Sequence, residues 1–128
     1  MRRAFLDSHV AFWVATGDSK LSASARKAIN GHSSTVISSI TLAELEMKAA
    51  LGRLPLPENL ASIFEAEGIT VESFDSAASA QLKRFPQLIR HDPFDRLILA
   101  QASSKFGTSF FTSDQALLAL GLDWIVEV

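Results

Sequence analysis

The sequence predicts an α/β fold in which helices cover both faces of a mostly parallel sheet of about five strands. Short apolar runs alternate along the chain with longer segments that carry the start and stop signals of helices. The runs are continuously apolar, which is typical of strands whose two faces are both buried. The expected strands are residues 4–6, 35–37, 69–71, 109–111 and 124–126.

The helices between these strands are predicted from their boundary residues. Residues 8–15 follow the first strand directly, and residues 22–30 begin at a serine and end before a glycine. Residues 42–51 follow Thr41, which with Glu44 at the third helical position has the pattern of a capping box. The other expected helices, each bounded by proline or glycine, are residues 58–67, 76–85, 93–106 and 115–120.

Composition narrows the class of protein. The 128 residues include 14 acidic and 12 basic side chains, a formal charge of −2, and no cysteine. A domain of this length buries enough surface to fold without disulfides, so residues 1–128 are expected to form a single domain. The lack of cysteine excludes cysteine zinc sites, iron–sulfur clusters and thiol catalysis. The apolar stretches are too short for a membrane span and there is no signal-peptide core, so we expect a cytoplasmic protein with no membrane partner.

Four acidic residues occupy positions that the predicted fold would bring together. Asp7 ends the first strand, Glu44 lies near the start of the helix after the second, and Asp114 follows the fourth. Asp95 lies in the first turn of the long helix that precedes the fourth strand, and Asp92 stands beside it. In a parallel α/β sheet, functional groups collect at the carboxyl ends of the strands.

Each acid taken alone has a simpler explanation as a helix cap. An acid near a helix N-terminus stabilises the helix by only about 0.3–1 kcal/mol through its dipole, and serine, threonine and asparagine cap equally well. Capping alone therefore does not explain four acids at one edge. Gathered carboxylates repel one another, and a bound divalent cation offsets this repulsion. A set of oxygen ligands without histidine or cysteine favours Mg²⁺ or Mn²⁺, which is typical of phosphoryl-transfer enzymes.

Four segments spread over nearly the whole chain carry a family pattern. They are residues 5–13, residues 38–45 with Lys48 and residues 51–54, residues 91–102, and Thr112-Ser113-Asp114. Their order and spacing resemble the PIN-domain family, specifically the VapC-type toxins of bacterial toxin–antitoxin pairs. The most specific of them is the third, HDPFDRLILAQA.

The resemblance implies a PIN-like three-layer α/β/α sandwich and a metal-dependent endoribonuclease. It implies that Asp7 and Asp95 are the principal ligands of Mg²⁺ or Mn²⁺, and that Glu44 and Asp114 complete the site directly or through water. Either Glu44 or Asp114 would orient the attacking water or accept its proton, and Thr112 would hold a water or Asp114. The expected products are a 5′-phosphate and a 3′-hydroxyl. The implied partners are an RNA substrate, a cognate antitoxin protein and a second copy of the chain in a homodimer.

Further residues near the motifs have two interpretations each. Lys48 stands four residues after Glu44, which fits an intrahelical ion pair as well as a contact to the RNA backbone. Arg96 is either a solvated surface residue or a phosphate contact, and capping is the favoured role of Asp92. His91 is interpreted as a structural or solvated histidine rather than a catalytic one.

Two other functions are compatible with parts of the sequence. The first is a catalytically weak PIN-like binding module that acts mainly through its partner complex, although the presence of all four acids counts against it. The second is an aspartyl-phosphate phosphatase, which needs a second aspartate two residues after the first, where this chain has His9. The net charge does not exclude a nucleic-acid partner, because setting the four site acids aside leaves ten acidic against 12 basic residues.

Overall fold

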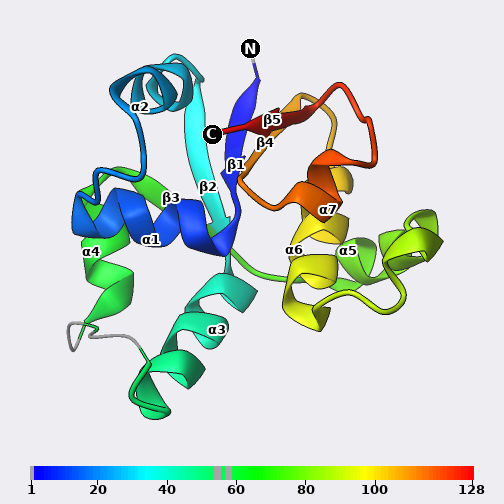
Figure 1. Cartoon of the computed structure of the whole chain (residues 1–128), viewed down its shortest axis with the longest axis horizontal. Helices are drawn as coiled ribbons and strands as arrows, with labels where there is room; N and C mark the ends of the chain where they lie inside the picture. Colours follow the sequence, from blue (N-terminus) through cyan, green and yellow to red (C-terminus); the bar gives the residue numbers. More distant parts are fainter. Residues whose placement is uncertain (1, 54–55, 57–58) are drawn as a thin grey trace.

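The computed structural model describes residues 2–53, 56 and 59–128, and these have the expected α/β architecture (Figure 1). The strands are β1 (Arg3–Leu6), β2 (Ser34–Ser38), β3 (Ile69–Glu72), β4 (Thr108–Thr112) and β5 (Ile125–Glu127). They form one five-stranded, all-parallel sheet in the order β3-β2-β1-β4-β5. Each strand overlaps a run predicted from the sequence, so the predicted sheet is confirmed.

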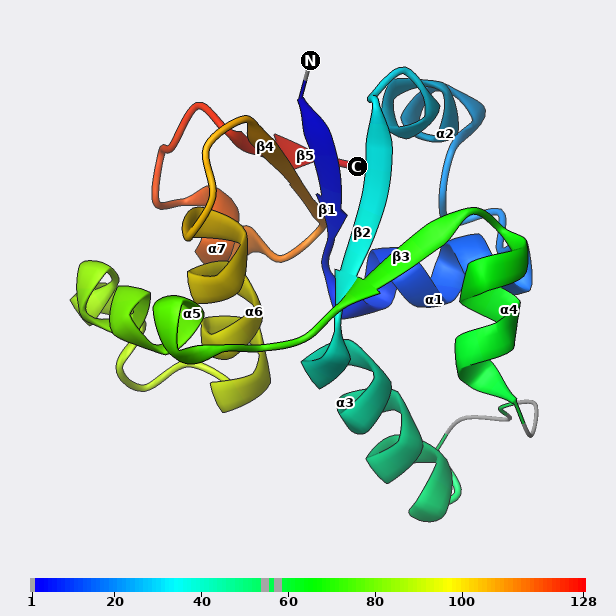
Figure 2. The same cartoon turned by 180° about the vertical axis from the view of Figure 1, so that it is seen from behind.

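Helices lie on both faces of the sheet and make the three-layer α/β/α sandwich (Figures 1 and 2). One face is covered by α1 (Ser8–Thr16), α2 (Ala23–Asn30) and α4 (Leu60–Ala66). The other is covered by α6 (Pro93–Ser103) and α7 (Gln115–Leu118), with α5 (Ser76–Ala80) packed against α6. The remaining helix, α3 (Ser39–Ala50), extends from the carboxyl edge of the sheet in both views.

Two apolar cores hold the layers together, one on each face of the sheet. Successive strand residues point to opposite faces, so Leu6 and Phe111 belong to the core under α1, and Phe5 and Phe110 belong to the core under α6. Phe5 and Phe110 are fully buried, and their rings lie 6.1 Å apart. Burial of such a side chain stabilises the fold by about 1.5–3 kcal/mol. The cores therefore fix the register of the central strands and the positions of their carboxyl ends.

The start of α3 differs from the prediction. The helix begins at Ser39 rather than at residue 42, and its N-cap is Ser38, whose hydroxyl accepts a hydrogen bond from the Ile40 N–H. The predicted capping box at Thr41 is therefore wrong. Thr41 lies inside the helix and is fully buried, with its hydroxyl 3.0 Å from that of Ser8. A serine upstream meets the same capping requirement, which frees Thr41 for a tertiary contact.

Three other helices end two or more residues earlier than predicted. The segment 76–85 is an α-helix only to Ala80, and a 3₁₀ turn follows it over Gln81–Arg84. Phe85, which precedes Pro86, has non-helical backbone, as expected before a proline. Helix α6 ends at Ser103 rather than at residue 106. At this end the hydroxyls of Ser103 and Ser104 each donate a hydrogen bond to the carbonyl three residues earlier. Helix α7 ends at Leu118 rather than at residue 120. The predicted start of the fourth helix at Glu58 lies outside the described residues.

The strand order places the ends of β1 and β4 side by side at the centre of the sheet. From β1 the chain continues outward to β2 and β3 on one side, and from β4 to β5 on the other. This reversal of direction is the position at which doubly wound sheets form their ligand sites. Within the described residues, no helix combines the length and the apolar character needed to cross a bilayer.

Candidate active site

Asp7 lies at the centre of the candidate site, directly after β1, and is 2% exposed. Its side chain caps α1, because Oδ1 accepts a 2.8 Å hydrogen bond from the Ser8 N–H. The other oxygen, Oδ2, accepts a 2.6 Å bond from the Thr112 hydroxyl, which in turn accepts a 3.0 Å bond from the Asp114 N–H. Thr112 therefore joins the ends of β1 and β4 and fixes the Asp7 carboxylate between them.

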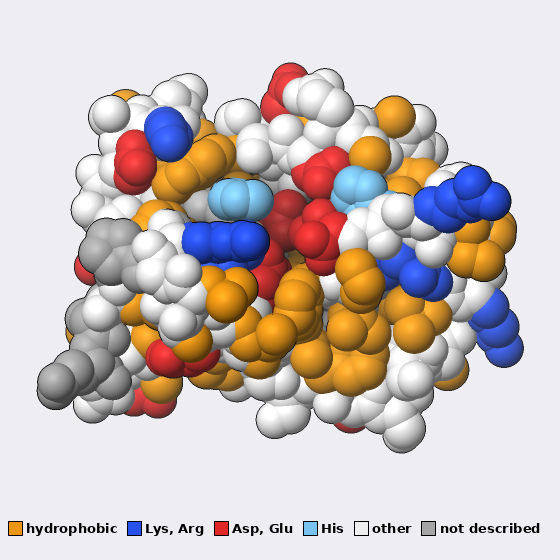
Figure 3. Space-filling view, turned by 60° about the horizontal axis from the view of Figure 1, so that its bottom comes forward, with side chains coloured by type: hydrophobic (Ala, Val, Ile, Leu, Met, Phe, Trp, Pro, Cys, Tyr) orange, Lys and Arg blue, Asp and Glu red, His pale blue; other side chains and the backbone are white. Residues whose placement is uncertain are grey.

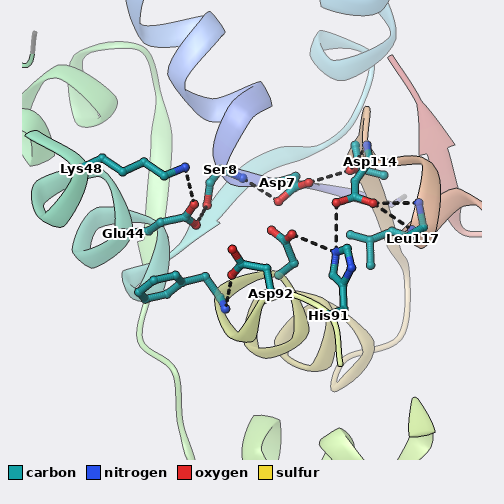
Figure 4. A network of polar contacts seen from close by, with 12 residues as sticks. Asp7, Ser8, Glu44, Lys48, His91, Asp92, Asp114 and Leu117 are labelled. Carbon is teal, nitrogen blue, oxygen red and sulfur yellow. Dashed lines mark hydrogen bonds and ion pairs between the residues drawn. The ribbon is translucent and has the colours of Figure 1, made fainter. Parts of the chain in front are cut away.

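Glu44 reaches the site from α3 and is 3% exposed. Its Oε1 accepts a 2.8 Å hydrogen bond from the Ser8 hydroxyl, and its Oε2 forms a 2.8 Å ion pair with Lys48 Nζ (Figure 4). The intrahelical pair anticipated for Lys48 is therefore present. Ser8 follows Asp7 directly, and its hydroxyl binds Glu44. The contact between α1 and α3 therefore holds the Asp7 and Glu44 carboxylates near each other.

Asp95 and Asp114 both contact the imidazole of His91. Asp95 is in the first turn of α6, and Asp114 caps α7 by accepting hydrogen bonds from the Ala116 and Leu117 N–H groups. The Nε2 atom of His91 lies 3.1 Å from Asp95 Oδ2 and 3.1 Å from Asp114 Oδ2 (Figure 4). The loop before α6 thus places an imidazole between two of the acids.

Burial, hydrogen bonds and neighbouring charges shift the pKa values of three of these acids. Burial, followed by the negative charges of Asp7, Asp92 and two other acids of the cluster, raises the pKa of Asp95 to about 7. Burial also raises the pKa of Asp7, although hydrogen bonds from Thr112 and Ser8 offset part of the rise. Burial alone would raise the pKa of Asp114, but backbone N–H groups and the His91 imidazole outweigh it and hold that pKa below its ordinary value.

The structure brings all four predicted acids together and places Asp92 near Asp95. Asp92 is exposed and caps α6, with its Oδ1 accepting a 2.8 Å hydrogen bond from the Phe94 N–H. Arg96 donates a 3.4 Å hydrogen bond to the Ile89 carbonyl, which ties α6 to the loop before it. Asp92 therefore acts on Asp95 by its charge, and Arg96 stabilises the loop that carries His91.

Two residues of the cluster are not identified from the sequence. His91 is interpreted there as structural or solvated, whereas the structure places it against two site carboxylates. His91 stands four residues before Asp95, and this spacing brings the two side chains together because α6 begins between them, at Pro93. The spacing is a signal for the contact only when the start of α6 is known. Ser8 has no sequence signal beyond its place after Asp7, because its contact with Glu44 depends on how α1 and α3 pack.

The donor chemistry of the cluster fits a divalent metal ion. Burial, and then neighbouring carboxylates, raise the pKa values of the buried Asp7 and the half-buried Asp95. A cation bound between the carboxylates would offset the same penalty on their charged forms. One ligand atom from each of His91, Asp95 and Asp114 lies within 4.8 Å of the other two, an arrangement able to hold an ion. The expectation of oxygen ligands alone is thus incomplete, because an imidazole nitrogen stands among them.

The cluster is accessible from outside, and two hollows border residues that contact its acids. Figure 3 shows acidic side chains in a depression between histidine and basic side chains, with apolar surface beside it. A hollow of about 470 Å³ borders His91 and is lined also by Arg90, by Ala116 of α7 and by the residues just after that helix. A smaller one of about 50 Å³ borders Ser8, His9 and Lys48. The larger hollow thus adjoins the acids at His91, and the smaller one adjoins them at Ser8 and Lys48.

Known proteins share this sequence pattern and this fold. The PIN domain family model matches residues 4–121. Ribonuclease VapC22 of Mycobacterium tuberculosis is 30% identical over 119 residues, which are 91% of each chain.

Three solved structures share the fold at lower sequence identity. A VapBC2 complex of Rickettsia felis bound to a promoter DNA fragment has a TM-score of 0.67 at 13% identity, with 98% of this chain and 96% of that chain covered. The DNA-bound VapBC of Salmonella typhimurium has 0.65 at 22% identity, with 100% and 98% covered. A toxin–antitoxin complex of Klebsiella pneumoniae has 0.66 at 16% identity, with 96% and 95% covered.

Proposed function

The chain belongs to the PIN-domain family, and from that premise we propose that it is a metal-dependent endoribonuclease, the toxin of a VapBC-type toxin–antitoxin pair. The observation that carries the proposal is the convergence of Asp7, Glu44, Asp95 and Asp114 at the carboxyl edge of the sheet. Repelling carboxylates are retained at one site where a cation binds between them, and such sites are used to cleave phosphodiesters. The relative named Ribonuclease VapC22 supports the same activity.

In this proposal Asp7 and Asp95 are the principal ligands of Mg²⁺ or Mn²⁺, and Glu44 and Asp114 complete the site directly or through water. The ion, when bound, supplies Lewis-acid stabilisation of the scissile phosphate and lowers the pKa of the attacking water. Thr112 and Ser8 hold the Asp7 carboxylate in one orientation, which removes the need to order it during the reaction. Glu44 or Asp114 orients the water or accepts its proton, and the products carry a 5′-phosphate and a 3′-hydroxyl.

In this proposal the RNA backbone runs across the acidic edge, near the two hollows that border His91 and Lys48. Arg90 lines the larger hollow and Lys48 the smaller one, so each side offers a positive charge to a phosphate. Lys48 also pairs with Glu44, and a phosphate contact would have to share its ammonium group with that carboxylate. Arg96 contacts the backbone of the loop before α6, and we assign it a supporting role there.

The biological setting follows from the same relatives. We propose that residues 1–128 act as a single PIN domain in the cytoplasm, as a homodimer held inactive by a cognate antitoxin protein. The three similar structures, described as VapBC or toxin–antitoxin complexes, support an antitoxin partner. The exposed apolar side chains of Met47 and Leu51, at the far end of α3, offer surface to such a partner.

Cleavage of RNA by the purified, antitoxin-free chain tests this function. We expect wild-type protein to cut RNA with Mg²⁺ or Mn²⁺ and to stop when a chelator is added. Asp7→Asn should reduce the rate about a hundredfold or more, since it weakens a metal ligand without changing the side-chain shape. The matched control is Asp123→Asn, an exposed acid just before β5 and so at the opposite edge of the sheet. A folded wild-type protein that cuts no RNA with either ion would instead favour the binding-module alternative.

A further inference from the structure

His91 is held in place by its own backbone as well as by its ring. The residue follows the 3₁₀ turn Pro86–Leu88, and its N–H donates a 2.9 Å hydrogen bond to the Leu88 carbonyl. Its side chain is 24% exposed, so one part of the ring contacts the cluster while another part faces the adjoining hollow. The imidazole therefore enters the acidic site from a fixed turn.

The distances from His91 Nε2 to Asp95 Oδ2 and Asp114 Oδ2 match those between ligand atoms around one ion. Two ligand atoms at right angles about an ion, each about 2.1 Å from it, lie about 3.0 Å apart. His91 Nε2 lies 3.1 Å from Asp95 Oδ2 and 3.1 Å from Asp114 Oδ2. All three atoms are within 4.8 Å of one another. A single ion can thus contact the nitrogen and both oxygens with little movement of the side chains.

We propose that His91 is a nitrogen ligand of the catalytic metal and gives the site a preference for Mn²⁺ over Mg²⁺. This inference rests on the cation site of the proposed function and adds a residue to it. Imidazole nitrogen suits transition-metal ions, whereas Mg²⁺ favours oxygen ligands and retains its waters. Replacing one oxygen position by Nε2 therefore raises affinity for Mn²⁺ more than affinity for Mg²⁺.

A different role would leave the same metal-free geometry. His91 could serve only as a hydrogen-bonding spacer that separates the Asp95 and Asp114 carboxylates. In that role the His91 ring has to move away from the two carboxylates when the ion enters. Substitution of His91 would then leave the affinity for Mn²⁺ unchanged or increase it. The two roles therefore predict opposite effects of substitution on metal binding.

Pulsed electron paramagnetic resonance on the Mn²⁺-loaded protein tests the proposal without using activity. We expect the electron spin echo envelope of wild-type protein to show modulation from a coordinated imidazole nitrogen, and His91→Gln to lose it. The matched control is His9→Gln, because His9 lines the smaller hollow and its charge lowers the pKa of Asp7 from outside the three-atom group. This control should keep the nitrogen signal.

Calorimetric titration of the same proteins supplies the second readout. His91→Gln should raise the Kd for Mn²⁺ about tenfold, the scale on which residues around a metal alter its binding, and raise the Kd for Mg²⁺ less. Bound Mn²⁺ without a nitrogen signal in wild-type protein, or a signal that persists in His91→Gln, would overturn the inference and leave the proposed function standing. Mn²⁺ binding that is unaffected by Asp95→Asn would instead overturn the metal site on which both depend.

Discussion

In the proposed metal site, Asp95 is the residue that would couple pH to metal binding. Burial and neighbouring carboxylates raise its pKa from 3.8 to about 7, so the folded chain holds this proton more tightly than the unfolded chain does. The resulting stabilisation is complete below about pH 4 and is lost as the pH rises through 7. We therefore expect the contribution of Asp95 to the free energy of unfolding, measured with a chelator present, to fall between pH 4 and 7.5.

Asp95→Asn should reduce this decline, because asparagine has no charge to expose on deprotonation. One pKa unit corresponds to about 1.4 kcal/mol. Between pH 4 and 7.5 the free energy of unfolding should therefore fall less in Asp95→Asn than in wild type, by more than about 1 kcal/mol. Urea unfolding at several pH values measures it, with Asp123→Asn as the control that leaves the slope unchanged. An identical pH dependence in wild type and Asp95→Asn would show that the carboxylates do not interact as described.

Thr112 connects two acids that the sequence places 107 residues apart. Thr112→Val keeps the shape but leaves the Asp114 N–H without its acceptor and Asp7 Oδ2 without its donor, which should lower the free energy of unfolding by about 1–3 kcal/mol. It should also weaken Mn²⁺ binding, as measured by calorimetry. The matched variant is Thr108→Val, since Thr108 is a buried threonine at the other end of β4 with its own hydrogen bonds. Equal loss of Mn²⁺ affinity in both variants would contradict a specific role of Thr112.

Among the elements, α3 separates what can be predicted locally from what cannot. The strands follow from short apolar runs, and the helices from glycine and proline, because both signals are local. The start of α3 is ambiguous, since Ser38, Ser39 and Thr41 can all cap a helix. Tertiary contacts decide between them: Ser38 also bonds to Gln101 of α6, and Thr41 packs against Ser8. The same packing brings Glu44 to the site from the second turn of the helix.

Amide hydrogen exchange distinguishes the two possible caps. Ser38→Ala should speed exchange at Ile40 and lower stability by about 1–2 kcal/mol, because Ile40 N–H loses its acceptor. Thr41→Ala should leave Ile40 protected, since Thr41 does not accept from that amide. A capping box at Thr41 would instead protect the Glu44 N–H. Faster exchange at Glu44 in Thr41→Ala, with Ile40 unchanged in Ser38→Ala, would restore the capping box predicted from the sequence.

At the scale of the whole molecule, the strand order explains why the acids meet. Asp7 and Asp114 follow strands that are neighbours in the sheet but far apart in the sequence, and the sequence predicts this convergence once a parallel sheet is assumed. The arrangement of His91, Ser8 and Lys48 around the acids is less predictable, because it depends on loop and helix packing that has no periodic signal. The four acids are therefore the predictable part of the site, and their hydrogen-bond partners are the part that requires the structure.

The central claim is that the acidic cluster binds the ion that RNA cleavage requires. It is tested most directly by titrating Mn²⁺ into one preparation and recording both the rise in Tm and the rate of RNA cleavage. Ligand that binds only the folded state stabilises it by RT ln(1 + [L]/Kd), so Tm begins to rise near the Kd and keeps rising above it. The Kd fitted from the Tm curve should therefore equal the Mn²⁺ concentration at which cleavage reaches half its maximum. In Asp95→Asn both should be lost together. Cleavage that proceeds without Mn²⁺ or another divalent ion, or that persists in Asp95→Asn after the rise in Tm is lost, would contradict the account.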